Sequence, residues 1–431
     1  MSLACHGCGA RPGERDPWPF RCTGGGDDVD HLIVRELDWH GPFIASDDPN
    51  PFVRWRQLLH SWQVWRAEGR ADDAWVALVR ALDEAVALVD GAGFRETPLR
   101  ELRGIGGLPE GARVLAKDET GNVSGSHKAR HLFGLMIWLR VVETLGWAPV
   151  GASRPRLAIA SCGNAALAAA VVARAADWPL EVFIPPSADR VVVERLLALD
   201  ATITACPREP GVPGDPCYHR FQAALRDGAL PFCCQGPDNG LTVEGGHTLG
   251  WELASQAGRL DRVFIQVGGG ALASAVIASL REAVALGAIP RMPRIHAVQT
   301  EGGHPLVRAW DRLQAHRAQA GVSEARALDW ARTHRASLMW PWETEPHSIA
   351  HGILDDETYD WLEIVRGMLE TGGSPVVVSE QDLREATVIA NEAGVPADPT
   401  GASGLAGLLR TRRMIAAPET VAVLLTGRRR E

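Results

Sequence analysis

Residues 156–206 read RLAIASCGNAALAAAVVARAADWPLEVFIPPSADRVVVERLLALDATITAC and alternate between short apolar runs and segments with helical spacing. We expect strands at 156–160, 180–185 and 201–206, with helices at 164–175 and 190–199 between them. Apolar strands joined through helices form parallel sheets that are covered on both faces. This stretch therefore predicts an α/β protein.

The same alternation continues on both sides of this stretch. A passage rich in Pro, Gly and Cys at 207–240 predicts a long loop around one helix. Tryptophans and leucines spaced three or four residues apart at 51–89 predict helices. Between 301 and 420 we expect a Trp- and Arg-rich segment and two helices. The remaining predicted elements are strands at 263–267, 294–300 and 421–426 and a helix at 271–284.

The length of 431 residues is about two to three times that of a typical domain, so we expect two subdomains around a large core. The expected fold is a two-lobed α/β protein with a parallel sheet in each lobe and helices on both faces. Its predicted parts are a cysteine-containing extension at 1–45, a large lobe formed by 46–122 and 235–431, and a small lobe at 123–234.

The composition narrows the class of partner. Hydrophobic residues make up 46%, charged residues 23%, and the net charge is -9, which argues against disorder and against a nucleic-acid binder. The sequence has no apolar run of about eighteen residues and no signal-peptide pattern at its N-terminus. We therefore expect a cytoplasmic protein that binds a small molecule, with neither a nucleic-acid nor a membrane partner.

Lysine is almost absent, since only Lys117 and Lys128 are lysines among the 44 basic residues. Lys117 stands in VLAKDE, where we expect an ordinary strand-end residue. Lys128 follows the Gly-rich turn GNVSGSH at 121–127 and precedes an apolar helix, for which Ser126 is the expected N-cap. An amine in the first turn of this helix is the candidate nucleophile.

Two further turns lead from a predicted strand into a helix. SCGNA at 161–165 places small residues and Asn164 at a helix N-terminus, whose free N–H groups attract a carboxylate. The alternative is that Asn164 serves only as the N-cap. GGGAL at 268–272 allows close backbone approach to a phosphate, and the alternative there is a tight turn. Its spacing matches neither G-x-G-x-x-G nor a Walker sequence.

In their order along the chain, these segments resemble the fold-type II pyridoxal-phosphate enzymes, the superfamily of threonine synthase, serine/threonine dehydratase and the tryptophan synthase β chain. The resemblance runs from about Thr97 to Gly427 through TPL, AKDE, GSHKAR, SCGNA, EGGHTLGWELASQ, VGGGAL, IHAVQTEG, DPTGASGLAG and LLTG. It implies a tryptophan synthase β-like fold with pyridoxal 5'-phosphate between the lobes, where helix N-termini converge.

The resemblance also implies a role for each candidate residue. Lys128 forms the Schiff base with the cofactor, Asn164 hydrogen-bonds the phenolic oxygen, and Thr426 faces the pyridine nitrogen. The cofactor phosphate is held by Gly268, Gly269, Gly270, Ala271 and Leu272. The residues implied in substrate binding are Ser126, Ser161, Cys162, Gly163 and Ala165.

The expected reaction follows from the neutral hydroxyl of Thr426, which does not hold the pyridine nitrogen protonated and so favours elimination or replacement over transamination. The predicted function is a lyase acting on an amino acid by elimination at Cβ or Cγ, as in threonine synthase or serine/threonine dehydratase. Threonine synthases usually carry Thr at the position of Ala165. The alanine in this chain therefore favours a dehydratase. His127 favours an alternative, β-replacement as in the tryptophan synthase β chain. A second alternative is an inactive homologue that binds the cofactor.

Three cysteines lie close together near the N-terminus, in the spacing Cys5-x2-Cys8-x13-Cys22. They resemble the cysteine knuckle at the start of many threonine-synthase-like proteins, and the spacing suits tetrahedral zinc. The fourth cysteine expected near position 25 is absent, so His6 or His31 would have to replace it. The alternative is three free thiols. The resemblance further implies a homodimer. The run from Arg428 to Arg430 is expected to be solvated, or to meet an anionic substrate tail.

Overall fold

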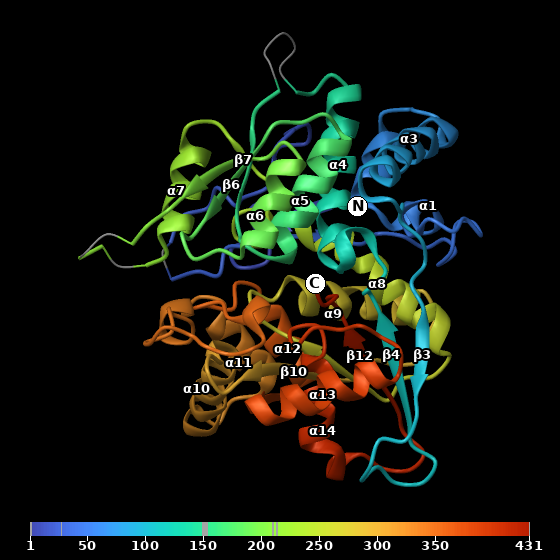
Figure 1. Ribbon diagram of the computed structural model, residues 1–431, viewed down its shortest axis with the longest axis vertical. Helices are drawn as coiled ribbons and strands as arrows, with labels where there is room; N and C mark the ends of the chain where they lie inside the picture. The colour runs from blue at the N-terminus through green and yellow to red at the C-terminus, as the bar shows by residue number, and fades with distance from the viewer. Residues whose placement is uncertain (1, 27, 149–153, 209–210, 213, 431) are drawn as a thin grey trace.

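The computed structural model describes residues 2–26, 28–148, 154–208, 211–212 and 214–430. The chain forms two lobes, each built around its own β-sheet with helices packed on it (Figure 1). A four-stranded sheet has the order β7-β6-β5-β8, and a six-stranded sheet has the order β11-β10-β9-β12-β4-β3. The two-lobed α/β class predicted from the sequence is confirmed.

The smaller sheet is parallel throughout, and its strands β5, β6 and β7 come from residues 156–206, whereas β8 lies beyond them. The helix α5 coincides with the predicted helix. Most of its alanines are buried, and their small side chains let neighbouring elements pack closely against it. Residues 209–210 and 213 of the predicted loop lie outside the described residues. The elements are β5 (Leu157–Ala160), α5 (Asn164–Ala175), β6 (Leu180–Ile184), α6 (Arg190–Ala198), β7 (Thr202–Ala205), α7 (Pro216–Arg226) and β8 (Leu230–Pro231).

The larger sheet is parallel except at one edge, where β3 runs antiparallel to β4. The prediction of a wholly parallel sheet is wrong there, because the connection at 103–112 is long enough for a hairpin but carries no crossover helix. The strands are β3 (Leu99–Leu102), β4 (Arg113–Asp118), β9 (Arg262–Gln266), β10 (Arg294–Thr300), β11 (Ser374–Val378) and β12 (Thr420–Leu425).

The region between β10 and β12 is richer in structure than the two predicted helices. It contains five helices and the edge strand β11, whose short SPVVV run was missed because proline argues against a strand interior and is tolerated at an edge. The helices of the larger lobe are α8 (Thr242–Ala257), α9 (Ala271–Ala285), α10 (Pro305–Ala320), α11 (Glu324–Ala331), α12 (Trp361–Thr371), α13 (Glu380–Glu392) and α14 (Ser403–Thr411).

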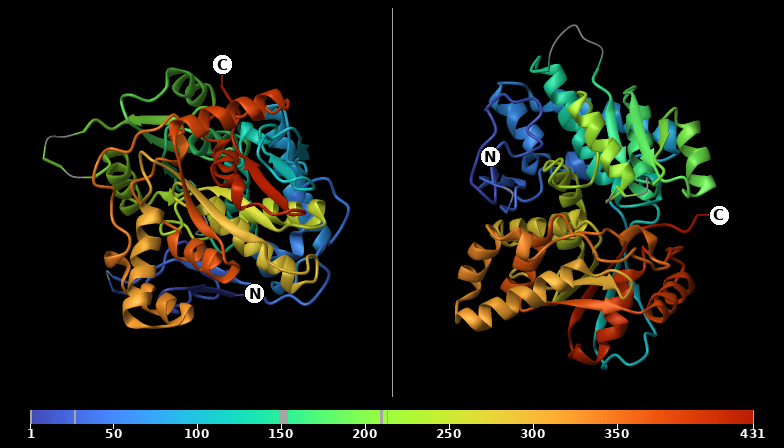
Figure 2. Two further views of the ribbon diagram at one scale, coloured as in Figure 1. Left: turned by 90° about the horizontal axis from the view of Figure 1, so that it is seen from below. Right: turned by 90° about the vertical axis from the view of Figure 1, so that its left-hand side faces the viewer.

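The N-terminal region packs beside both lobes (Figure 2). β1 (Ser2–Cys5) pairs antiparallel with β2 (Ile33–Glu36), and the backbone N–H of Gly240 donates to the carbonyl of Phe20. Trp138 Nε1 donates to Pro17 O, which joins the extension to α4 (Lys128–Thr144). The helices α1 (Pro51–Arg54), α2 (His60–Ala67) and α3 (Asp72–Asp90) follow. In the described part of the chain, no helix combines the length and apolar character needed to cross a membrane.

Candidate functional site

The helix α4 begins at Lys128, three residues after the end of a 3-10 turn at Val123–Gly125. His127 occupies the N-cap position and makes no side-chain capping bond, whereas Ser126 is extended with φ −160°. The expectation that Ser126 caps the helix is therefore wrong. Its Oγ is buried and has no hydrogen-bond partner among the described residues. An unpaired buried hydroxyl is costly, so this position suits a ligand that would pair with it.

The two lysines have opposite surroundings. Lys117 is fully buried, and its Nζ donates to Glu252 Oε2 at 2.6 Å, to Gln256 Oε1 at 2.8 Å and to Thr97 O at 2.7 Å. The expectation of an ordinary strand-end residue is wrong for Lys117. Lys128 is partly exposed and forms no hydrogen bond or ion pair within the described ranges. Its amine is the one available for chemistry.

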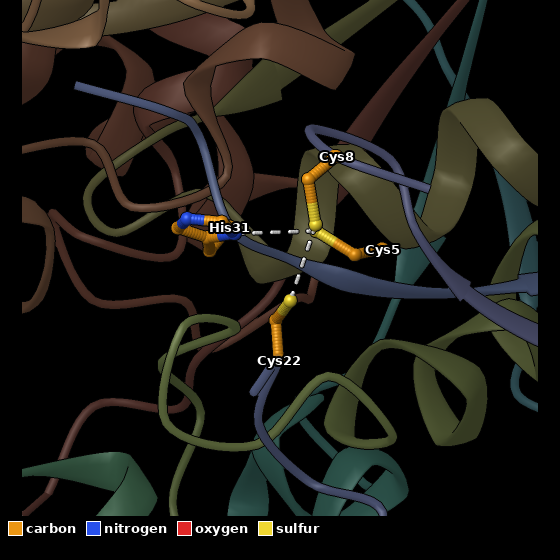
Figure 3. Close-up of side chains that lie close together, drawn as sticks. All are labelled: Cys5, Cys8, Cys22 and His31. Carbon is orange, nitrogen blue, oxygen red and sulfur yellow. Dashed lines mark hydrogen bonds between the residues drawn. The ribbon is translucent and has the colours of Figure 1, made fainter. Parts of the chain in front are cut away.

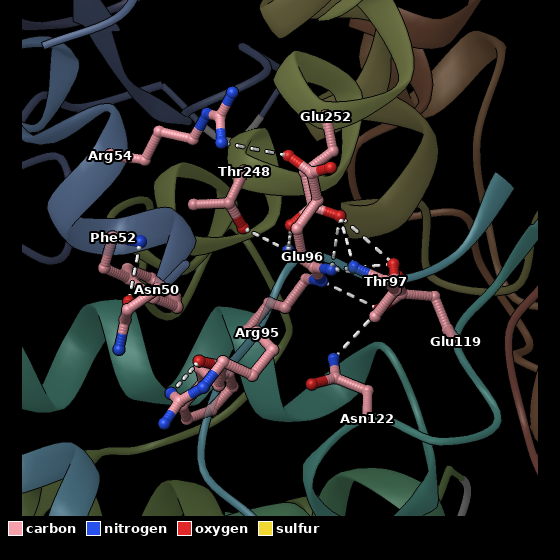
Figure 4. Close-up of polar contacts among 12 residues, drawn as sticks. Asn50, Phe52, Arg54, Arg95, Glu96, Thr97, Glu119, Asn122, Thr248 and Glu252 are labelled. Carbon is pink, nitrogen blue, oxygen red and sulfur yellow. Dashed lines mark hydrogen bonds and ion pairs between the residues drawn. The ribbon is translucent and has the colours of Figure 1, made fainter. Parts of the chain in front are cut away.

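A buried charge network fixes the start of α4. Arg130 donates to Glu119 Oε2 at 2.7 Å and to Glu252 Oε1 at 2.6 Å, and Glu252 also pairs with Lys117. Figure 4 shows Glu119, Glu252, Thr97 and Thr248 close together in this network. Because β4, α4 and α8 all contribute to this network, the first turn of α4 is anchored two residues beyond Lys128.

The residues just after β12 contact two other predicted segments, the turn before α4 and the end of β9. The backbone N–H of His127 donates to Thr426 O at 3.1 Å, and Ser126 forms a β-bridge with Gly427. Gln266, at the end of β9, donates through Nε2 to Thr426 Oγ1 at 2.5 Å. Parallel strands end at the same sheet edge, which is why residues so far apart in sequence meet here.

Asn164 comes to the same place from the smaller lobe. It is the first residue of α5, and the N-cap is Gly163, so the alternative of Asn164 as the N-cap is wrong. A Cβ on Gly427 would lie 2.9 Å from Asn164 Nδ2. The turn that leads into α5 is partly exposed, and no side chain caps the helix, so its first N–H groups remain open to a ligand. That turn holds Ser161, Cys162 and Gly163, followed by Asn164 and Ala165.

Arg430 is exposed, as expected for a solvated residue, and its guanidinium also donates to Asn164 Oδ1. The signal for this contact was present in the sequence, since the arginine run begins three residues after β12, which ends at Leu425. The structure therefore adds a cation to the residues around Asn164.

The glycine turn leads into the fifteen-residue α9, which has no side-chain cap. Gly270 is the N-cap with φ +105°, and a Cβ on Gly269 would lie 2.8 Å from the ring of Tyr359. Thr358 Oγ1 donates to Gly268 O, and the backbone N–H of Asp360 donates to Gly269 O, both at 3.0 Å. A turn of this shape, backed by a helix dipole, has the geometry that suits an anion. Ala271 and Leu272 form the first turn of α9.

Two acidic residues beside this turn were missed from the sequence. Burial raises the pKa of Asp355 to about 6, while Lys128 and a hydrogen bond from the Gly269 N–H oppose that rise. Burial raises the pKa of Asp360 to about 8, and both of its carboxyl oxygens lack a partner among the residues described. Both residues lie in the irregular segment before α12, where no periodic pattern could have placed them.

The N-terminal cysteines converge with one histidine (Figure 3). One ligand atom from each of Cys5, Cys8, Cys22 and His31 lies within 4.8 Å of the others. His6 instead directs its Nε2 to Asp30 Oδ2 at 2.8 Å, so the structure selects His31 from the two predicted histidines. A Cβ on Gly24 would lie 2.8 Å from Cys8 Sγ, which explains a glycine at this close approach.

A family profile described as "Pyridoxal-phosphate dependent enzyme" matches residues 92–427, which include both lysines, both helix N-termini and Thr426. The chain belongs to the pyridoxal-phosphate-dependent enzymes. Threonine synthase from Methanosarcina acetivorans is 24% identical over 326 residues, which cover 73% of this chain and 70% of that protein. This member of the family is therefore related to threonine synthase at low identity.

Solved structures of related proteins share the fold. The T.th. threonine deaminase superposes with a TM-score of 0.56 at 24% identity, covering 82% of this chain and 98% of that chain. The processed form of threonine deaminase isoform 2 from Solanum lycopersicum gives 0.59 at 15% identity, covering 94% and 96%. At these identities the likeness establishes the two-lobed architecture.

Proposed function

We propose that this pyridoxal-phosphate-dependent enzyme is a lyase that acts on an amino acid by elimination at Cβ or Cγ. The observation that carries the proposal is the meeting of a partner-free lysine, an uncapped glycine turn and a neutral hydroxyl at one sheet edge. His127, the residue before Lys128, donates its backbone N–H to the carbonyl of Thr426. The Thr426 hydroxyl in turn accepts a hydrogen bond from Gln266, which precedes the glycine turn.

The residues fit the cofactor at two points, Lys128 and the glycine turn. Lys128 has a free amine that can hold the aldehyde carbon. Gly268, Gly269 and Gly270, with Ala271 and Leu272 in the first turn of α9, offer backbone N–H groups to the phosphate. A Cβ on Gly269 would strike Tyr359, so the turn could not carry side chains. Asp355 opposes the phosphate, because its carboxylate accepts from the same Gly269 N–H.

Thr426 sets the electronic character of the site. Its Oγ1 accepts a hydrogen bond from Gln266, which leaves its own hydrogen free to be donated to the pyridine nitrogen. When bound, pyridoxal phosphate withdraws electrons from the Cα of an amino acid, and a neutral partner for the ring suits elimination. Asn164 is proposed to donate to the phenolic oxygen from the facing side, and Gly427 leaves room for its amide.

The chain's own residues supply substrate binding and proton transfer. The open N–H groups at the start of α5, after the turn from Ser161 to Gly163, are proposed to bind the substrate carboxylate, which their lack of a side-chain cap supports. The unpaired hydroxyl of Ser126 is a further donor. Lys128 Nζ takes the proton from the substrate Cα, since it is the amine of this site that has no competing partner in the described structure.

Product analysis tests this proposal. The purified enzyme is incubated with serine, threonine or O-phosphohomoserine, and ammonia, 2-oxo acid, phosphate and threonine are measured. Formation of 2-oxo acid with ammonia supports a dehydratase, which Ala165 favours, and phosphate with threonine supports a threonine synthase. Turnover that requires an added nucleophile would show β-replacement instead. Absence of turnover with every amino acid, with cofactor bound, would reject the lyase.

We also propose that Cys5, Cys8, Cys22 and His31 bind zinc. Three thiolates and one imidazole form a common tetrahedral zinc set, and their ligand atoms already lie within 4.8 Å of one another. A backbone hydrogen bond from Ala10 helps to lower the pKa of Cys8 to about 7, so a thiolate is available near neutral pH. Metal analysis should find one zinc per chain, and the His31→Ala variant should lose it while His6→Ala keeps it.

A further inference from the structure

We propose that Asp30 is a positioning residue that couples metal binding at the cluster of Cys5, Cys8, Cys22 and His31 to cofactor binding at the glycine turn. The inference rests on the proposed roles of these two sites. It requires a continuous physical connection between them, and the structure contains one, made of hydrogen bonds between buried and partly buried groups.

The first step lies within the cluster. Asp30 directly precedes His31 and is 3% exposed, and its Oδ2 accepts from His6 Nε2 at 2.8 Å. His6 directly follows Cys5. The Asp30–His6 pair thus links the two chain segments that supply the proposed ligands Cys5 and His31, so an ion bound by both segments would fix the position of this carboxylate.

The second step connects Asp30 to α12. Its Oδ1 accepts from Trp361 Nε1 at 3.1 Å and lies 3.5 Å from Arg335 Nε, while its backbone N–H donates to Arg332 O. Trp361 is fully buried and is the first residue of α12. Asp30 therefore holds the beginning of this helix from the N-terminal extension.

The third step connects the start of α12 to the glycine turn. Asp360, just before Trp361, donates its backbone N–H to Gly269 O, and the nearby Thr358 Oγ1 donates to Gly268 O. A peptide group is planar, so fixing these two carbonyls also fixes the orientation of the Gly269 and Gly270 N–H groups. These are two of the donors proposed for the cofactor phosphate.

A coupling of this kind is reciprocal. If metal tightens cofactor binding by some factor, the cofactor must tighten metal binding by the same factor. For a connection through a few hydrogen bonds, we expect a factor of about ten in each direction.

The experiment uses the full chain freed of cofactor and metal. Pyridoxal phosphate is titrated with and without excess Zn²⁺, and Co²⁺ is titrated with and without pyridoxal phosphate, with absorbance as the readout. Trp361→Phe removes the indole N–H while retaining most of the ring packing. Trp340→Phe is the matched control, because it removes an indole N–H that donates to the exposed Glu343.

In the wild type and in Trp340→Phe, we expect metal to tighten cofactor binding about tenfold, and the cofactor to tighten Co²⁺ binding equally. In Trp361→Phe, both affinities should become independent of the other ligand. A wild-type cofactor affinity that is the same with and without metal would overturn the inference, and so would full coupling in Trp361→Phe. The wild-type titration decides the question even if the variant does not fold. Because the readout is binding, absence of lyase turnover rejects the proposed reaction without affecting this result.

Discussion

Lys117 and Lys128 carry the same amine and lie on neighbouring elements, β4 and α4, yet the protein surrounds them in opposite ways. Lys117 is fully buried among Thr97, Glu252 and Gln256, which accept from its ammonium group. Lys128 is partly exposed and unpaired in the described structure, beside buried hydroxyl and carboxyl groups that also lack partners.

With the roles proposed for the two lysines, the partners rather than the residue type separate a structural amine from a reactive one. A buried charge with matched partners stabilises the packing around it only as long as the set is complete. A site for a ligand must instead keep its donors and acceptors unused. The charges of Lys117, Arg130, Glu119 and Glu252 are all matched with one another. This network anchors α4, the helix that begins with the unpaired Lys128.

The largest expected effect is that of Lys128→Ala. Activity should fall by about 10²- to 10⁴-fold because the proton-transferring amine is lost, and the visible absorbance band of lysine-bound cofactor should disappear. Stability in urea should change little, because the side chain makes no polar contact in the described ranges. Lys128→Arg keeps the charge without a nucleophilic amine, so activity in that variant would contradict the assignment.

The opposite pattern is expected for Lys117→Met. Loss of the Lys117 amine leaves one oxygen of the buried Glu252 without its ammonium partner. Breaking a buried ion pair in this way typically costs about 3–5 kcal/mol in the free energy of unfolding. Urea denaturation measures this value. Cofactor bound per folded chain should stay unchanged. A stable Lys117→Met variant that lacks cofactor would reverse the roles assigned to the two lysines.

Asp355→Asn tests the acidic group at the glycine turn. Above about pH 6 the wild-type carboxylate is charged and repels a phosphate at the Gly269 N–H, whereas below that pH it is protonated. Wild-type affinity for pyridoxal phosphate should therefore fall relative to Asp355→Asn as pH rises through about 6, reaching a difference of about tenfold. Equilibrium titrations across this range measure it.

The matched control for this titration is Asp356→Asn, which removes the neighbouring carboxylate. Its affinity should still fall as pH rises, as in the wild type, with the midpoint slightly lower because the Asp356 charge helps to raise the pKa of Asp355. A ratio between wild type and Asp355→Asn that does not change with pH would show that Asp355 does not face the phosphate.

The smallest effect is expected for Asn164→Ala. One hydrogen bond to the cofactor is worth about 1 kcal/mol, so cofactor affinity should weaken about fivefold, and the absorbance maximum should shift. Ala165→Ser, one residue along the same helix, should leave the spectrum unchanged. An unaltered spectrum in Asn164→Ala would place this amide away from the ring.

The elements with a strong period could be predicted from the sequence. The strands and helices at 156–206 repeat apolar residues at clear spacing, and α5 begins and ends where expected. β11 could not be identified, because its five residues begin beside a proline and pair only at a sheet edge.

The candidate site could be predicted where a motif carried it, as with Lys128 and the glycine turn. Ser126 was wrongly expected to be the N-cap of α4, because its extended backbone follows from a bridge to Gly427, a contact set by the distant end of β12. The choice of His31 over His6, and the presence of Asp355 and Asp360, depend on how distant loops pack. Local patterns contain no information on such contacts.

Chemical trapping of the bound cofactor tests the contrast between the two lysines most directly. The enzyme loaded with pyridoxal phosphate is reduced with borohydride, which makes the lysine linkage permanent, and the labelled peptide is identified by mass spectrometry. The label should lie on Lys128 alone. A label on Lys117, or cofactor that remains bound yet leaves both lysines unmodified, would contradict the central claim.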